Sequence, residues 1–273
     1  EFHYRLPWLN SGLHPGAHRS RQSGQGQRSR EFAPLLRYPD PRRIDLRTTL
    51  YDPMGEVYVR VFHQRSTVPV YVIADVSASM GFREKVAVLA DFTLATAASA
   101  HRTGDPFGFV ACDTRVRMHY PATRGRGVAE DLHARLPELQ AAGRNAAGIV
   151  AAAALLPRRR ALVFLVSDFH LPAAQIEAAL SALCTHDVVP IVLWHGAEYE
   201  RLPRFGLCEL HDPETGVRRF VLMRRRLRAK VIDAYRRQQQ RLRRLCIAHG
   251  REPFFLVDGF EPDRLTEYFL TMA

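Results

Sequence analysis

The chain has almost no lysine: of its 39 basic residues, all but Lys85 and Lys230 are arginine. It also has no apolar run of the ~18 residues that a membrane-spanning helix requires. The first thirty residues are polar and lack the hydrophobic stretch of a signal peptide. These absences predict a cytoplasmic protein without a transmembrane segment.

Cysteine is scarce and dispersed. The four cysteines lie far apart, and no two of them form a C-x-x-C pair. Such cysteines are typical of reduced thiols in a cytosolic protein, so the sequence predicts no disulfide framework. The twelve histidines are scattered as well, and none has the H-E-x-x-H spacing of a zinc enzyme.

Acidic residues are too few to balance the arginines, and the formal net charge is +11. A strongly basic protein favours an anionic partner, which can be an acidic protein surface, a nucleic acid or a membrane. Aromatic residues are not interleaved with the arginines, as they are on surfaces that stack nucleic-acid bases. This pattern disfavours nucleic acid as the partner.

The most informative motif is an apolar run over 68–74 that ends in Asp75-x-Ser77-x-Ser79. Such a run is typical of a buried parallel strand, and open α/β sheets bind ligands at the carboxyl ends of their strands. One carboxylate and two hydroxyls are hard oxygen ligands, which suit Mg²⁺ or a similar, partly hydrated cation. The simpler alternative is a turn whose serines cap the following helix.

Apolar segments of strand and helix type alternate along the chain. We expect strands over 57–62, 68–74, 107–112, 116–120, 161–166, 188–194 and 254–257. We expect helices over 84–101, 128–136, 146–156, 173–185, 224–249 and 262–271. This alternation predicts an α/β fold, in which right-handed crossovers build a mostly parallel sheet with helices on both faces.

The amino-terminal part of the chain has a different composition. Residues 1–30 include a stretch rich in Gly, Ser, Gln and Arg, which predicts a flexible or extended arm. One domain over 31–273 should follow, with its own amino-terminal segment over 31–66 and a β-hairpin over 207–223.

Two other polar segments should meet the Asp75 motif at the carboxyl edge of the sheet. Ser167-Asp168 ends the second fully buried strand, and Gly143-Arg144-Asn145 forms the loop before the helix at 146. Side chains from these three places would lie close together, because parallel strands end at the same edge.

This set of motifs resembles the von Willebrand factor A fold and its metal-ion-dependent adhesion site. The resemblance implies a bound divalent cation, Mg²⁺ or alternatively Ca²⁺ or Mn²⁺, with one coordination position open for a partner's Glu or Asp. The implied metal-site residues are Asp75, Ser77, Ser79, Asp168 and Asn145. Asn145 stands where the family usually has threonine, so a site that has lost its metal is an open alternative.

A narrower resemblance covers residues 30–170. The segments Arg37-Tyr38-x-x-x-Arg42-Arg43-Ile44-Asp45, Gly104-Asp105-x-x-Gly108 and Val166-Ser-Asp-Phe169 are similar to domain-of-unknown-function family 58. The chain departs from that family's common pattern at Pro39-Asp40-Pro41 and at Leu46. Genes of the family often lie beside MoxR-type AAA+ ATPases, and one membrane-free type is encoded in methanol dehydrogenase gene clusters.

The resemblance therefore implies a cytoplasmic, non-enzymatic adaptor that binds a MoxR-type AAA+ ATPase and other maturation proteins. Its role would lie in methanol dehydrogenase maturation and metal insertion. A basic membrane-surface or nucleic-acid binder and a metal-dependent hydrolase are the alternatives. No Walker A motif or G-x-S-x-G elbow is present, so an enzymatic function has little support.

The segment over 224–246 carries nine arginines and one lysine, with Asp233 as its only acidic residue. Apolar residues recur along it at helical spacing, which predicts an amphipathic helix packed on the sheet. Its basic face is either simply solvated or a docking face for an acidic partner.

Overall fold

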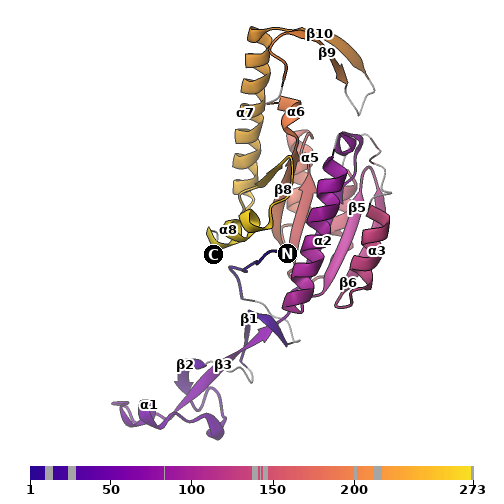
Figure 1. The fold of residues 1–273 in the computed structure, drawn as a ribbon. Helices are drawn as coiled ribbons and strands as arrows, with labels where there is room; N and C mark the ends of the chain where they lie inside the picture. Colours follow the sequence, from indigo (N-terminus) through magenta and orange to yellow (C-terminus); the bar gives the residue numbers. More distant parts are fainter. Residues whose placement is uncertain are drawn as a thin grey trace. The chain divides into compact units, whose positions relative to one another are not determined.

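The computed structural model describes residues 1–9, 15–23, 29–82, 84–136, 141, 143, 147–199, 202–211 and 217–271. The chain folds into two compact units (Figure 1). The larger unit contains Glu1–Tyr4 and Pro69–Met272, and the smaller one contains Arg5–Val68. Val68 lies inside the domain predicted over 31–273, whose bounds stay a prediction.

A six-stranded sheet forms the centre of the larger unit. In spatial order its strands are β11 (Phe254–Val257), β8 (Asp187–Trp194), β7 (Leu162–Ser167), β4 (Val70–Asp75), β5 (Phe107–Cys112) and β6 (Val116–Thr123). The β5–β6 pair is antiparallel and the other pairs are parallel. Since the chain first builds outward from β4 to β6 and then returns to β7, the order reverses beside β4, as in doubly wound folds. The predicted α/β fold with a mostly parallel sheet is confirmed.

Helices cover both faces of this sheet (Figure 1). They are α2 (Lys85–Thr103), α3 (Gly127–Arg135), α4 (Gly148–Ala153), α5 (Ala173–Ala182), α7 (Arg225–Ala248) and α8 (Pro262–Thr271), and the short α6 (Gly196–Tyr199) follows β8 at the edge of the sheet. Because side chains alternate along a strand, Ile73 and Leu165 share one face and pack with residues of α4, α5 and α7. Phe164 points to the other face, where its ring meets Phe92 of α2 and Phe269 of α8.

Phe2 and Tyr4, near the amino terminus, pack into the core of the larger unit. Phe2 is 1% exposed, and its ring stacks on Phe92 and Phe269. The hydroxyl of Tyr4 donates to Asp105 Oδ2 at 2.5 Å and lies 2.7 Å from the Thr103 hydroxyl. The predicted amino-terminal arm is therefore not confirmed, because aromatic side chains bury this end of the chain.

Replacing Tyr4 by phenylalanine tests this anchoring. We expect Tyr4→Phe to lower the free energy of unfolding by about 1–2 kcal/mol, since the buried Asp105 loses one of its hydrogen-bond donors. Urea unfolding followed by fluorescence would measure the loss. An unchanged stability would show that the Tyr4–Asp105 hydrogen bond contributes nothing to the fold.

The smaller unit is built around a three-stranded antiparallel sheet. Its strands are β1 (Pro15–Ser23), β3 (Tyr58–Ser66) and β2 (Ser29–Pro34) in spatial order, and the turn η1 (Pro41–Arg43) and helix α1 (Leu46–Leu50) lie between β2 and β3 in sequence. Asp45 caps α1 by accepting a 2.8 Å bond from the Thr48 amide, and its carboxylate pairs with Arg60. We expected the strand over 57–62, but β1 and β2 were not predicted, because the sequence of β1 is mostly polar.

The predicted hairpin over 207–223 is present as the two-stranded sheet of β9 (Gly206–His211) and β10 (Arg218–Met223). The connection that leaves β8 passes through α6 to this hairpin, and α7 follows it. The hairpin therefore lies in the segment that starts at the carboxyl end of β8 and returns through the long α7 (Figure 1).

Candidate metal-binding site at the carboxyl edge of the sheet

The Asp75 motif forms a tight turn directly after β4. Asp75 is the last residue of β4, and its Oδ1 accepts a 2.8 Å hydrogen bond from the Ser77 amide. This bond is typical of aspartate at a turn, where the side chain replaces a backbone acceptor. The turn continues into η2 (Ala78–Gly81), with the Met80 amide 3.0 Å from the Ser77 carbonyl. The short turn keeps the two serines beside Asp75.

The second half of the site comes from β7, the neighbour of β4. Ser167, the last residue of β7, donates from its hydroxyl to Asp75 Oδ2 at 2.6 Å. Asp168 follows and is 1% exposed, and the next residue, Phe169, adopts a left-handed φ of 52°. Since β4 and β7 are the strands between which the sheet order reverses, the site lies where α/β sheets open a crevice.

The serine hydroxyls are arranged as a cation would require. Ser77 Oγ and Ser79 Oγ are 3.2 Å apart, and both residues are buried. Two neighbouring ligands of an octahedral Mg²⁺, each bound at about 2.0–2.1 Å, lie about 3 Å apart. The donor set of hydroxyl and carboxylate oxygens therefore fits a hydrated divalent cation. Ser77 and Ser79 would bind such an ion directly, and the carboxylates of Asp75 and Asp168 would lie beside it.

A buried ammonium group stands at the same site. Lys85 begins α2 and is 3% exposed, and its Nζ contacts Asp168 Oδ2 at 3.0 Å and Glu198 Oε1 at 2.8 Å. The same Nζ lies 3.5 Å from the Ser79 carbonyl. Lys85 thus neutralises part of the negative charge and links the Ser79 turn, Asp168 and α6.

The two aspartates have opposite pKa shifts. Burial, together with the negative charge of Asp168, raises the pKa of Asp75 to about 6. Burial alone would also raise the pKa of Asp168, but the positive charges of His170 and Lys85 and their hydrogen bonds outweigh it and lower that pKa. The buried carboxylate of Asp75, which accepts hydrogen bonds from Ser77 and Ser167, is the feature that a divalent cation would stabilise.

The second loop reaches the site through Gly143. Its carbonyl accepts a 3.1 Å bond from the Ala78 amide, and its φ is 99°. A Cβ at this position would lie 2.8 Å from Asp113 Oδ2, so only glycine fits between the turn and the buried Asp113. Asn145, which we expected to face the metal, lies outside the described residues.

The sequence identified part of this cluster. The structure brings Asp75, Ser77, Ser79 and Asp168 to one place, as predicted, but Lys85, Glu198 and Asp113 were not predicted to be there. One signal for Lys85 was available, because it is one of two lysines in an arginine-rich chain. Among the described residues, no three His, Cys, Asp or Glu side chains form a metal cluster, so any metal bound here relies on the serines.

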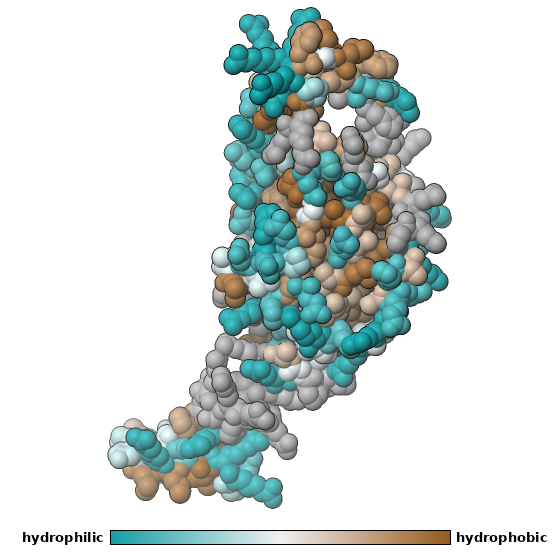
Figure 2. Space-filling view, in the orientation of Figure 1, coloured by the Kyte–Doolittle hydropathy of each residue, from teal (hydrophilic) through white to brown (hydrophobic). Residues whose placement is uncertain are grey.

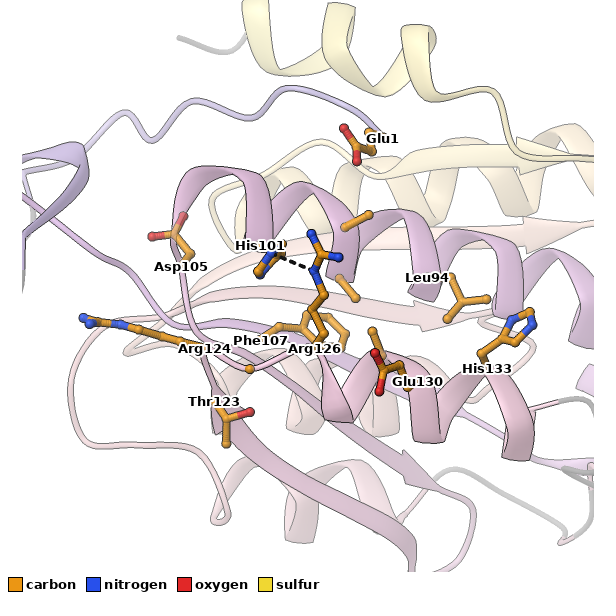
Figure 3. Close-up of a pocket in the computed structure, with 14 residues that line it drawn as sticks. Glu1, Leu94, His101, Asp105, Phe107, Thr123, Arg124, Arg126, Glu130 and His133 are labelled. Atoms are coloured by element: carbon orange, nitrogen blue, oxygen red, sulfur yellow. Dashed lines mark hydrogen bonds between the residues drawn. The ribbon is translucent and has the colours of Figure 1, made fainter.

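A cavity of about 600 Å³ lies at the other end of the sheet. Phe107 at the start of β5 and Thr123 at the end of β6 line it, so it is far from Asp75 along the strands. Figure 3 shows Arg126 of the loop before α3 donating to His101 of α2, at 3.0 Å. Its lining mixes cationic and acidic side chains over an apolar floor, so it defines no class of ligand.

The strand order and the cluster at its reversal point define an α/β protein with a carboxyl-edge oxygen site. The chain belongs to the family described as protein of unknown function DUF58, whose model matches residues 39–241. A relative from Paracoccus denitrificans, described as an uncharacterized protein in the moxR 3' region, is 42% identical over 98 residues. That match covers 36% of this chain and 93% of the relative.

Several solved structures are similar at low sequence identity. The conserved hypothetical protein BatB from Bacteroides thetaiotaomicron is 11% identical, with a TM-score of 0.47 over 76% of this chain and 98% of that one. A von Willebrand factor type A protein from Catenulispora acidiphila is 17% identical, with a TM-score of 0.44 over 78% of this chain and 43% of that one. The fold assignment itself rests on the observed strand order.

None of the helices within the described ranges combines the length and the apolar character needed to cross a bilayer.

Proposed function

We propose that the protein is a non-enzymatic adaptor that captures an acidic side chain of a partner protein through a divalent cation. The observation that carries this proposal is the cluster of Asp75, Ser77, Ser79 and Asp168 at the reversal point of the sheet. Its two hydroxyls lie 3.2 Å apart beside a carboxylate whose pKa is raised by burial and by Asp168. Mg²⁺ is the expected ion, with Ca²⁺ and Mn²⁺ as alternatives.

The charges at the site favour capture over tight metal binding. Lys85 already neutralises part of the negative charge of Asp168 and Glu198. A cation bound there would keep positive charge and would complete its coordination with water or a partner's carboxylate. Because affinity rises with the charge of the ligands, the protein alone should bind Mg²⁺ weakly, and the partner should strengthen it.

A catalytic role has less support from the same contacts. Serine is a weak nucleophile unless an adjacent base activates it. Ser77 Oγ lies 3.2 Å from the Ser79 hydroxyl, which is no base, and its side chain also hydrogen-bonds the Asp75 carboxylate, whose oxygens already accept bonds from Ser167 Oγ and the Ser77 amide. A hydrolase would turn over phosphate esters and lose this activity in Asp75→Ala.

A MoxR-type AAA+ ATPase is the proposed partner. Support comes from the relative whose description places it in the moxR 3' region. The sequence resemblance extends to MxaS, a protein encoded in methanol dehydrogenase gene clusters. We therefore place the adaptor in methanol dehydrogenase maturation, including calcium insertion, and in the cytoplasm together with the ATPase.

The exposed arginines of α7 support a second candidate. Only Leu242 and Cys246 of this 24-residue helix are buried, so most of its basic side chains face solvent. A protein that binds an anionic membrane surface or a nucleic acid through this helix would lose binding with salt and would be indifferent to Mg²⁺.

The test is capture of the purified MoxR-type ATPase that is encoded beside the gene, in Mg²⁺ and in EDTA. We expect wild-type protein to retain the ATPase in Mg²⁺, and both EDTA and Asp75→Ala to reduce capture by about tenfold or more. Asp91→Ala is the matched control, because Asp91 is an exposed aspartate on α2. Capture that is indifferent to both Mg²⁺ and Asp75 would eliminate the metal mechanism.

A further inference from the structure

The hairpin of β9 and β10 exposes an apolar face. Its register places Leu222 opposite Leu207 and Phe220 opposite Glu209, and alternating side chains put all four on one face. The exposed fractions are 71% for Leu207, 70% for Phe220 and 40% for Leu222. On the opposite face, Cys208 and Val221 are half-buried.

This exposure is unusual for a two-stranded sheet. An isolated hairpin is marginally stable in water, and it normally buries its apolar face against another element. Figure 2 shows apolar surface over the hairpin, beside hydrophilic surface at the start of α7. A contiguous apolar patch rimmed by polar residues typically marks a binding surface.

Positive charge is concentrated where α7 begins. Arg224 is the N-cap residue, and Arg225 and Arg226 follow it, all of them exposed. The first turn of α7 contains no acidic residue, and the N-cap side chain accepts no amide bond. Since the amino end of a helix is itself positive, these arginines are unfavourable for the helix alone. Such a local conflict is expected where a partner supplies the missing negative charge.

The acidic residue of the hairpin face does not offset this charge. Glu209 Oε1 lies 3.5 Å from Arg218 Nη1 and is paired with it. The surface therefore remains positive next to its apolar side chains. Its complement is a surface that presents aspartate or glutamate beside apolar groups.

The hairpin also begins at the same edge of the sheet as the candidate metal site. The chain leaves the carboxyl end of β8 at Trp194 and reaches the hairpin through α6. Glu198 of α6 contacts Lys85, which contacts Asp168. A protein bound at the metal site would therefore approach the end of the molecule from which the hairpin extends.

We infer that the partner captured at the metal site also docks on this hairpin with an acidic surface that carries apolar side chains. The hairpin surface is defined here as Leu207, Phe220, Leu222, Arg224, Arg225 and Arg226. The inference rests on the proposed function, because it assigns a second contact to the same partner. A second copy of the chain fits poorly, since two positive surfaces would repel each other.

Two double variants separate the apolar and the charged parts of the hairpin surface. Phe220→Ser with Leu222→Ser removes apolar area, and Arg225→Glu with Arg226→Glu reverses the charge. The second variant should fold with an unchanged or higher Tm, because acidic residues favour the amino end of a helix. Arg236→Glu with Arg237→Glu is the matched control, with the same charge change about three turns further along α7.

The measurement is the Kd for the purified MoxR-type ATPase in Mg²⁺, together with binding to vesicles of phosphatidylglycerol and phosphatidylcholine. We expect each hairpin variant to weaken the ATPase complex by at least about tenfold, and the control variant by less than about threefold. Both hairpin variants should keep the response to EDTA. Circular dichroism and Tm would show that each variant is folded.

The outcomes distinguish this inference from the proposed function. Wild-type affinity in both hairpin variants, with loss only in Asp75→Ala, would overturn the hairpin inference and leave the metal mechanism standing. Loss in the hairpin variants with normal binding by Asp75→Ala would overturn the metal mechanism alone. If the hairpin variants lose vesicle binding and keep the ATPase, the surface binds membranes and the inference is wrong. Failure of the wild type to bind the ATPase would overturn both.

Discussion

Replacing Lys85 by methionine should lower the free energy of unfolding by about 3–5 kcal/mol. The ammonium group is buried between Asp168 and Glu198, at 3.0 Å and 2.8 Å from their oxygens. Methionine has a similar volume but no charge, so it would remove the counter-ion of Glu198 and one of the two positive charges that act on Asp168, at the same edge as Asp75. A buried charge that loses its partner is strongly destabilising.

The chain provides a matched control, because its other lysine is exposed. Lys230→Met should change stability by less than about 0.5 kcal/mol, since Lys230 lies on the surface of α7. Urea unfolding of both variants in EDTA would measure the difference. Equal stabilities of the two variants would show that the Lys85 ion pairs contribute little.

The same variant should also respond more strongly to Mg²⁺. Without the ammonium group, the site gains one unit of negative charge, and cation affinity rises with the charge of the ligands. We expect Mg²⁺ to restore more stability to Lys85→Met than to the wild type. Adding Glu198→Gln should restore part of the stability without metal, because it removes the carboxylate that lost its counter-ion.

Asp75→Asn should make the metal-free protein more stable at pH 7.5, by up to about 3 kcal/mol. Burial and the charge of Asp168 raise the pKa of Asp75 to about 6 in the folded protein. In the unfolded chain the pKa of an aspartate is about 3.9. The folded state therefore holds the Asp75 proton more tightly than the unfolded chain does. The stability that this proton contributes is fully present below about pH 4 and is lost as the pH rises through 6.

Asparagine cannot ionise, so the variant does not lose stability as the pH rises through the pKa of Asp75. The stability difference between variant and wild type should grow from pH 4 to pH 7 in EDTA. Adding Mg²⁺ at pH 7.5 should stabilise the wild type and leave Asp75→Asn nearly unchanged, because a ligand that binds the folded state raises its stability. Urea unfolding of both proteins in EDTA at pH 4 and pH 7, and at pH 7.5 with and without Mg²⁺, would test this. An equal Mg²⁺ response in the two proteins would place the ion elsewhere.

Much of the larger unit could be predicted because its elements carry strong local patterns. The strand over 107–112 and the helix over 262–271 have the predicted bounds, and β4, β7 and β8 begin or end within two residues of their predictions. Strands buried on both faces have to be continuously apolar, and the turns between them are marked by Gly, Pro and Asp. Such signals lie within a few residues of one another.

The smaller unit and the amino terminus were harder to predict. In β1 the buried residues include His18 and Ser20, so the strand lacks the apolar alternation that marks a half-buried strand. Phe2 is buried by residues of α2, β7 and α8, which lie far from it in sequence. A short apolar segment gives no local sign of such partners.

At the candidate site, the sequence by itself determined which oxygen ligands exist and which strands they follow. Asp75, Ser77 and Ser79 are adjacent in the chain, and Asp168 follows an apolar strand of the same kind. Only the tertiary structure decided that Lys85 and Glu198 join them. These two residues are 113 positions apart in the chain, and their side chains form an ion pair at 2.8 Å. Ion pairing depends on distances between side chains from separate elements, and the packing of α2 and α6 at one edge of the sheet sets those distances.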